Sequence, residues 1–330
     1  MTYRKIAQLA NVSLSTVSKA LSGSKEIRED LREEIIRIAI EQGYFAEKGR
    51  RKIEYAKNGA ITAAIVCPEI ISIAYAGEIT AVKEAIEERG GLASIYVYDF
   101  DREQLNRIIE TITVRNCADG IIMFPPGPFS TGHSIPIVGI CSYDMDYDTI
   151  HSDVGAYFLD VVSYLKELGH REIVFVGETN TVSKLEAFRK SMEKCGLPCG
   201  EDSVYIIEER FEAIGYQAAK EIMGRSSLPT AVICAYDEIA MALIHSLTEK
   251  GIRVPEQISV VGINDIPMAA YSQVPLTTVR VFQENQGEIA VNLLYDKIFG
   301  RSEAIQHITV KHELVKRKST GRARTEGEGQ

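Results

Sequence analysis

The chain has 330 residues, of which 45% are hydrophobic and 25% charged, a composition typical of a globular protein with two or three domains. No apolar run is long enough to cross a membrane, and the N-terminus is basic and amphipathic rather than a signal peptide, so we expect a cytoplasmic protein. The net charge of −9 is uneven, because residues 1–58 carry 12 Lys and Arg against 8 Asp and Glu while the remainder carries 25 against 38. A basic head on an acidic body is typical of a protein that approaches DNA with one end.

The first forty residues predict a helix-turn-helix followed by a third, supporting helix. A short first helix with Ile6 and Leu9 on its apolar side leads into a polar turn at residues 11–13. Ser13 is the expected N-cap of the second helix, whose Val17 faces back onto the first. An apolar stripe at helical spacing then predicts the third helix.

The second helix leaves small polar and basic residues on its outward side. Residues 1–25 include four basic residues and no acid, unlike an ordinary solvated helix face, although a plain three-helix bundle is the alternative interpretation. A recognition helix presents its N-terminal residues to base edges in the major groove, while hydroxyl and amide groups around it bind phosphates. We predict base contacts from Leu14, Ser15 and Lys19, and contacts to the DNA backbone from Thr16, Ser18, Tyr3 and Arg4.

The segment "IAQLANVSLSTVSKALSG" resembles the DNA-binding signature of the lactose-repressor (LacI/GalR) family of bacterial transcription regulators, and the resemblance continues to about residue 318. It implies an N-terminal all-α helix-turn-helix domain followed by an α/β, two-lobed, periplasmic-binding-protein-like sensor domain with two parallel doubly wound sheets. It also implies a hinge helix at residues 46–59, in which Ile53 wedges into the minor groove. This stretch departs from the family pattern, since Ala46 and Glu47 replace the usual proline and asparagine, so a plain linker is the alternative.

From residue 60 onward, short apolar runs alternate with amphipathic helices, and the alternation starts again after Asp153. Repeated βα units of this kind indicate two parallel sheets, one in each lobe. We expect the following domains: residues 1–45, DNA-binding; 46–59, hinge; 60–318, effector-binding and dimerisation, with lobe 1 at about 60–153 and 282–310 and lobe 2 at about 154–281 and 311–318; and 319–330, a disordered tail.

The sequence carries no recognisable catalytic motif. It lacks the glycine-rich phosphate loops and the G-x-S-x-G elbow, and its six His and six Cys residues show no metal-ligand spacing. The cysteines stand singly in mostly apolar surroundings, which predicts buried thiols rather than disulfides. We therefore expect a protein that is not an enzyme and that has no cofactor and no metal site.

Ligands of parallel α/β sheets bind at the carboxyl ends of the strands. At these ends the resemblance implies an effector site between the lobes, formed by Tyr75, Lys184, Arg210, Tyr236 and Asn264. Lys184 stands where the family usually has arginine, Arg210 where it often has an aromatic residue, and Asn264 where it usually has aspartate. Two cations and one lost acid suggest an anionic sugar derivative as the effector.

These features predict a ligand-responsive repressor that binds a pseudo-palindromic operator as a homodimer, because one head buries too little DNA for physiological specificity. A small sugar or sugar derivative between the lobes would control its affinity for DNA. The alternative is a constitutive or architectural DNA-binding protein whose lobes serve only for dimerisation. The sequence leaves open whether the effector releases DNA or promotes its binding, and whether dimers pair into tetramers.

Overall fold

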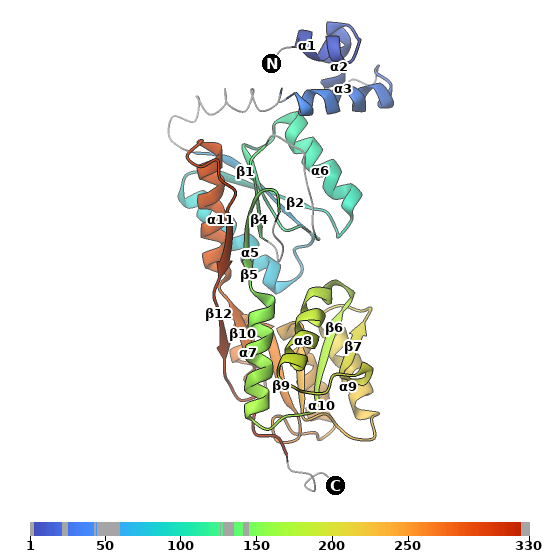
Figure 1. Ribbon diagram of the computed structural model, residues 1–330, viewed down its shortest axis with the longest axis vertical. Coiled ribbons are helices and arrows are strands. Elements are labelled where there is room, and N and C mark those ends of the chain that lie inside the picture. Colours follow the sequence, from blue (N-terminus) through green and yellow to red (C-terminus); the bar gives the residue numbers. More distant parts are fainter. Residues whose placement is uncertain are drawn as a thin grey trace. The chain divides into compact units, whose positions relative to one another are not determined.

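The computed structural model describes residues 3–21, 26–42, 44, 60–125, 127, 135–140 and 145–324 (Figure 1). The chain divides into two compact units, each of which is assembled from more than one stretch of sequence. The first unit comprises Met1–His151 and Gln283–Ile308, and the second comprises Ser152–Phe282 and Thr309–Gln330. The hinge prediction, including Ile53, falls on residues outside the described ranges.

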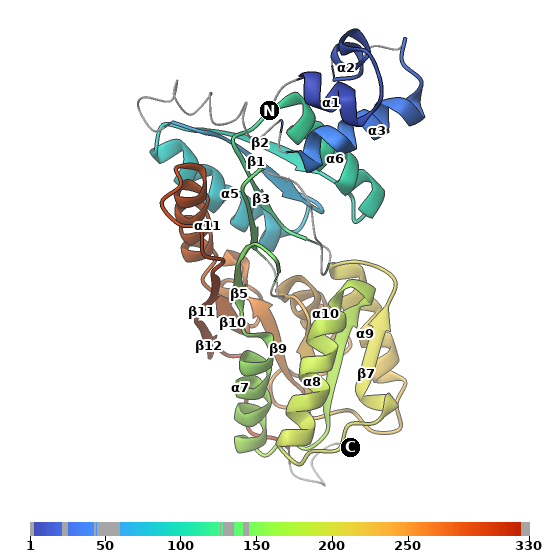
Figure 2. The same ribbon diagram turned by 45° about the horizontal axis from the view of Figure 1, so that its top comes forward.

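The head of the first unit is a bundle of three helices, α1 (Tyr3–Leu9), α2 (Leu14–Leu21) and α3 (Glu29–Glu41) (Figure 2). Ile6, Val17 and Ile35, one from each helix, are fully buried in a common core. Apolar residues from three short amphipathic helices therefore meet in one cluster, as the sequence predicts.

The start of α2 and one position of α1 are informative in detail. The Thr16 backbone N–H donates to Ser13 Oγ at 3.0 Å, so the predicted N-cap is confirmed. The prediction that Leu9 lies on the buried side of α1 is wrong, because its side chain is 49% exposed. Ala7, next to Ile6, is buried instead, so the buried side of α1 is turned toward Ala7 and leaves Leu9 largely exposed.

The body of the first unit is a six-stranded sheet in the order β11-β5-β4-β3-β1-β2, with parallel pairing from β5 to β2. Hydrophobic residues of α6 pack on one face of this sheet. On the other face, a Cβ atom at Gly120 would lie 2.6 Å from Leu294 of α11, so the absent side chain permits close packing. The elements are β1 (Thr62–Cys67), α5 (Ile73–Glu88), β2 (Leu92–Val97), α6 (Arg102–Arg115), β3 (Gly120–Met123), β4 (Ile137–Ile140), β5 (Asp148–Ser152), α11 (Gln283–Ile298) and β11 (His307–Val310).

The second unit repeats this design with a sheet in the order β12-β10-β9-β8-β6-β7, in which β12 alone runs antiparallel to its neighbour. Helices α9 and α10 approach closely because a Cβ atom at Gly215 would lie only 2.5 Å from the carbonyl oxygen of Ile239. The elements are α7 (Val154–Glu167), β6 (Ile173–Glu178), α8 (Val182–Lys194), β7 (Val204–Ile207), α9 (Glu212–Met223), β8 (Ala231–Cys234), α10 (Asp237–Glu249), β9 (Ser259–Asn264), β10 (Thr277–Val281) and β12 (His312–Val315). Three short 3₁₀ turns complete this unit.

The prediction of a disordered tail from residue 319 is wrong for residues 319–324. Ser319 is fully buried, and its hydroxyl group donates to the carbonyl oxygen of Val260 at 2.6 Å. The backbone N–H of Gly321 donates to Ser259 Oγ, and that of Ala323 donates to the Leu168 carbonyl group. A polar composition suggests disorder when only the sequence is known. Here these polar groups form hydrogen bonds with residues of the second unit, which order the segment.

Candidate DNA-binding and effector sites

Helix α2 has one buried side and one exposed side. Val17 and Ala20 lie in the core of the head, whereas Leu14 is 47% exposed and Ser15 is exposed beside it. Lys19, in the last turn of the helix, is also exposed. The three residues predicted to contact bases thus share the side of α2 that the core leaves free.

The residues predicted to contact the DNA backbone differ in their surroundings. Arg4 and Ser18 are exposed, so their predicted role needs no rearrangement. The Thr16 and Ser13 hydroxyl groups are hydrogen-bonded to each other at 2.8 Å, which assigns Thr16 a part in the helix cap. The Tyr3 ring stacks on the Tyr44 ring with centroids 5.4 Å apart, so it supports the packing of the head.

In the second unit, three of the predicted effector residues meet at the carboxyl ends of the strands. Arg210, after β7, binds the Glu178 carboxylate through Nε at 2.9 Å and Nη2 at 3.2 Å. The Tyr236 hydroxyl group, after β8, donates to the same carboxylate at 3.2 Å. The Lys184 ammonium group lies 4.3 Å from the centroid of the Tyr236 ring and donates to the Ala235 carbonyl oxygen at 2.8 Å.

Glu178 is the residue of this cluster that the sequence analysis missed. It is the last residue of β6 and only 1% exposed, and it binds side chains that follow both neighbouring strands. The chain leaves β6 for β7 on one side and later adds β8 on the other, so Glu178 and Tyr236 lie at the switch point of the sheet, where ligands bind in such folds. The sequence did carry one indication of this role, because Glu178 is an acidic residue at the end of an otherwise apolar strand.

Aromatic surface completes the cluster. The Phe211 ring lies 6.5 Å from the Tyr236 ring, and the Arg210 guanidinium group lies 4.6 Å from the centroid of the Phe211 ring. Phe211 has a φ of +54°, a backbone conformation that is costly for an aromatic residue and that places it directly before α9. Arg210 stands where the family often has an aromatic residue, and in this chain the next residue, Phe211, supplies an aromatic ring beside it.

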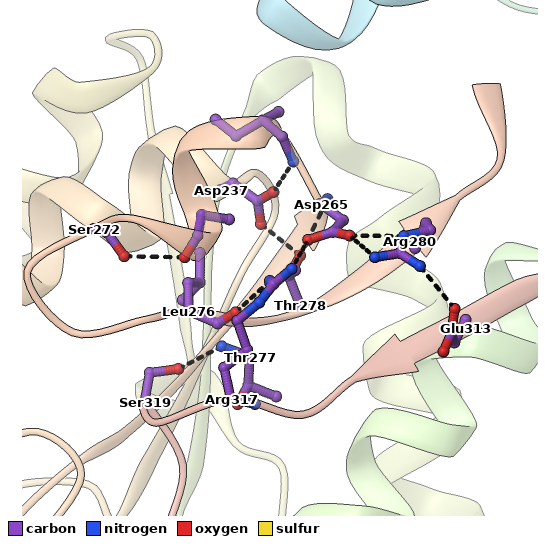
Figure 3. A network of polar contacts seen from close by, with 12 residues as sticks. Asp237, Asp265, Ser272, Leu276, Thr277, Thr278, Arg280, Glu313, Arg317 and Ser319 are labelled. Carbon is purple, nitrogen blue, oxygen red and sulfur yellow. Dashed lines mark hydrogen bonds and ion pairs between the residues drawn. The ribbon is translucent and has the colours of Figure 1, made fainter. Parts of the chain in front are cut away.

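Asn264 lies at the end of β9 and is followed by an ionic network (Figure 3). Asp265 Oδ2 lies 2.7 Å from Arg280 of β10, and Asp265 Oδ1 lies 2.6 Å from Arg317, which follows β12. Asn264 and Asp265 have φ angles of +112° and +52°, which the surrounding contacts must stabilise. Within the described residues, Asn264 Nδ2 is buried without a hydrogen-bond partner, so it is an unsatisfied donor beside the candidate site.

Asp237, the first residue of α10, is fully buried beside this network and is joined to it through Thr278 (Figure 3). Its carboxylate accepts a hydrogen bond from Thr278 Oγ1 at 2.5 Å and another from the Ile266 backbone N–H at 2.8 Å. Burial raises the pKa of Asp237 to about 7, because desolvation of the charged form outweighs these two hydrogen bonds.

The shifted pKa of Asp237 predicts a pH dependence of stability. Between about pH 4 and pH 7 the folded chain keeps a proton that the unfolded chain releases, so the free energy of unfolding falls as the pH rises through this window. Asp237→Asn, which cannot ionise, should lack this part of the slope. Urea midpoints of both proteins are measured from pH 4 to pH 8. The wild type should lose stability relative to Asp237→Asn as the pH rises to about 7, and the difference between the two midpoints should stay constant above it. Parallel profiles across the whole range would contradict the prediction.

Tyr75 belongs to the first unit. Its ring meets the Phe124 ring edge-on with centroids 5.9 Å apart, at the carboxyl ends of β1 and β3. These two strands form the switch point of the first sheet, as β6 and β8 do in the second. The backbone N–H of Tyr75 donates to the capping hydroxyl group of Ser72. Tyr75 thus lies at the switch point of the first sheet, as Tyr236 lies at the switch point of the second.

Other kinds of site find no support in the described part of the chain. None of its helices is both long and apolar enough to span a bilayer. No three His, Cys, Asp or Glu side chains within it gather as metal ligands do. Cys67, Cys195 and Cys234 are buried thiols as predicted, but Cys117 and Cys199 are exposed, so the expectation of burial fails for these two.

Two family models match the chain. Residues 2–47 match bacterial regulatory proteins of the lacI family, and residues 162–320 match a periplasmic binding protein-like domain. Together with the fold, they define a class, a transcription regulator with a helix-turn-helix head and a periplasmic-binding-protein-like body. The chain belongs to the lacI family of bacterial regulatory proteins, which confirms the family and the fold class expected from the sequence.

Similar proteins share nearly the whole length of the chain. The HTH-type transcriptional repressor PurR of Haemophilus influenzae is 27% identical over 336 residues, covering 96% of this chain and 98% of that protein. PurR of Salmonella paratyphi B is 29% identical and covers 96% of each chain. The transcriptional regulator CelR in complex with cellobiose has a TM-score of 0.70 at 23% identity, over 97% of this chain and 99% of that one. Relatives that are repressors also confirm the expectation that this chain is not an enzyme.

Proposed function

We propose that this protein is a dimeric transcriptional repressor of the lacI family that binds a pseudo-palindromic operator and responds to a small sugar or sugar derivative. The observation that carries the proposal is the exposed side of α2, where Leu14, Ser15 and Lys19 lie clear of the core that holds the helix. A short helix packed in this way can place its free side in the major groove. A repressor acts on chromosomal DNA, so we also propose a cytoplasmic location.

Selection from a pool of randomised duplex DNA with the full-length protein tests this function. We expect enrichment of an inverted repeat, because two heads related by a two-fold axis read two half-sites. Enrichment of a single half-site would contradict the dimer, and recovery of random sequence would contradict specific DNA binding.

Exposed apolar side chains support a dimer. β2, an edge strand of the first sheet, exposes Leu92 at 68% and Ile95 at 46%. In the second unit, Tyr271 is 87% exposed and Met268 is 50% exposed, both in or next to the 3₁₀ turn after β9. Exposed edges and large apolar side chains favour association with another chain. A second copy of this chain would cover such surfaces.

The cluster around Glu178 supports a polar ligand with a ring. Cations, a phenol group and two aromatic faces suit the hydroxyl groups and the apolar faces of a sugar. Solved lacI-type regulators with similar folds hold sucrose (TM-score 0.70, 22% identity) and ribose (TM-score 0.69, 20% identity). Glu178 offsets one of the two cations that the sequence shows, so the cluster carries one net positive charge rather than two. An effector with at most one negative charge fits it best.

Glu178→Gln should change this charge preference. The variant adds one net positive charge, so we expect affinity for a singly or doubly charged sugar to rise about tenfold relative to the matched neutral sugar. Thermal shifts of full-length protein with glucose, glucuronate and glucose 6-phosphate measure the preference. Glu186→Gln, an exposed position on α8, is the control with the same change of charge. Equal preferences in Glu178→Gln and the control would contradict the assignment.

A further inference from the structure

An acidic residue lies against the exposed side of the recognition helix α2. The Lys19 ammonium group donates a hydrogen bond to the Glu26 carboxylate, seven residues further along the chain. Both side chains are exposed, Lys19 at 48% and Glu26 at 68%. A pair so open to solvent stabilises the fold little. Its presence beside residues predicted to read DNA therefore points to another role.

The backbone next to Glu26 is held in place. Ile27 packs against the core of the head, and its carbonyl oxygen accepts a hydrogen bond from Arg32 Nη2 at 3.1 Å. Two residues further on, α3 begins at Glu29. The hydrogen bond and charge of Lys19 lower the pKa of Glu26, so its carboxylate is ionised at neutral pH and can only accept hydrogen bonds. Lys19 and Glu26 thus present a donor and an acceptor side by side.

This pair matches the edge of one kind of base pair. In the major groove a G·C pair presents the guanine acceptors O6 and N7 next to the cytosine N4 donor, and lysine binds the former while glutamate accepts from the latter. An A·T pair presents only one acceptor, adenine N7, on the near side of its amino donor at N6, and the thymine O4 acceptor on the far side of that donor would repel a carboxylate. The G·C edge, with two adjacent acceptors for lysine and a donor for glutamate beside them, therefore fits the pair better. We propose that Glu26 is a specificity-determining residue that reads the cytosine amino group of a G·C pair whose guanine is bound by Lys19. This inference rests on the proposed function, because it requires α2 to enter the major groove.

The charge of Glu26 explains why such contact would give specificity. Phosphates repel a carboxylate on any DNA sequence, so Glu26 weakens binding to DNA in general. Where a cytosine amino group lies within reach, the new hydrogen bond offsets that repulsion. The acid therefore discriminates chiefly by penalising wrong sequences.

The test compares DNA selected by four full-length proteins, wild type, Lys19→Ala, Glu26→Ala and Glu34→Ala. Glu34 is exposed on α3, so its variant loses the same charge without touching the pair. We expect the wild type and Glu34→Ala to select the same inverted repeat with a fixed G·C pair in each half-site. Lys19→Ala and Glu26→Ala should both lose preference at that pair. Thermal unfolding of the three variants should match the wild type, since all three side chains are exposed.

Affinities for two duplexes give the magnitude. Replacing the fixed G·C pair by A·T should weaken the wild type about tenfold or more, but Glu26→Ala by less than about threefold. Unchanged base preference in Glu26→Ala, or relaxation at every position alike, would overturn the inference while leaving the proposed function intact. A wild type that enriches no sequence would remove the proposed function and this inference together.

Discussion

Val17→Asp should abolish DNA binding, weakening the affinity for a selected operator by more than about 100-fold. Val17 is fully buried between the helices of the head, where it contacts the cluster that contains Ile6 and Ile35. A carboxylate there has no cation to pair with among the buried residues of that cluster. The head must therefore unfold or expose its core, and α2 loses the support that holds its reading side.

Leu9→Asp is the matched control for Val17→Asp. It introduces the same charge into the same head, but Leu9 is 49% exposed, so the bundle should stay folded and the loss of affinity should be much smaller. Limited proteolysis of the two variants would show cleavage within residues 3–44 of Val17→Asp only. Operator binding by Val17→Asp within about tenfold of the wild type would contradict this account of the head.

Asp265→Ala should destabilise the second unit by about 3–5 kcal/mol, because it leaves arginine charges without their counter-ion. Only 6% of the Asp265 side chain is exposed, and its ion-pair partner Arg317 is 17% exposed. Arg280 is 40% exposed, so water can solvate part of its charge once Asp265 is removed. Most of the lost stability therefore comes from Arg317, whose more buried charge is left without its counter-ion. The left-handed backbone at Asp265 would also lose the contacts that hold it.

Glu313 provides the control for Asp265→Ala, because it binds the same Arg280 at 3.0 Å but is 54% exposed. Glu313→Ala should cost about 0–1 kcal/mol. Urea unfolding followed by circular dichroism compares the midpoints of both variants with that of the wild type. Equal midpoints for Asp265→Ala and Glu313→Ala would show that the network in Figure 3 stabilises less than its burial indicates.

Much of the fold follows from the sequence for a plain physical reason. In both sheets the central strands are short apolar runs such as β8, and the helices between them carry apolar residues at helical spacing, so the alternation is visible directly. The prediction for Leu9 was wrong because hydrophobicity alone does not say which side of a short helix faces the core of a three-helix bundle. The prediction of disorder for residues 319–324 was wrong because their order depends on hydrogen bonds to distant segments, such as the one to Val260, which no local sequence pattern shows.

The candidate effector site was predictable in part. Lys184, Arg210 and Tyr236 follow strand ends and also match family positions, and the structure brings these three together. Glu178 escaped notice because an acid at the end of a strand looks like an exposed loop residue until its partners are known. Charge counting on the sequence therefore overstated the positive charge of the cluster by one.

The most direct test of a ligand-responsive repressor is the affinity of the full-length protein for its selected operator, measured by fluorescence anisotropy with and without a ligand. A panel of sugars, sugar phosphates, uronates and nucleobases is first screened by thermal shift, where a ligand at 100 times its dissociation constant adds about 2.7 kcal/mol of stability. We predict that a stabilising ligand changes operator affinity by about 5- to 150-fold, the range of ordinary allosteric coupling. Identical operator affinity at saturating ligand, or no stabilising ligand in the panel, would contradict that claim and favour a constitutive DNA-binding protein whose lobes serve for dimerisation.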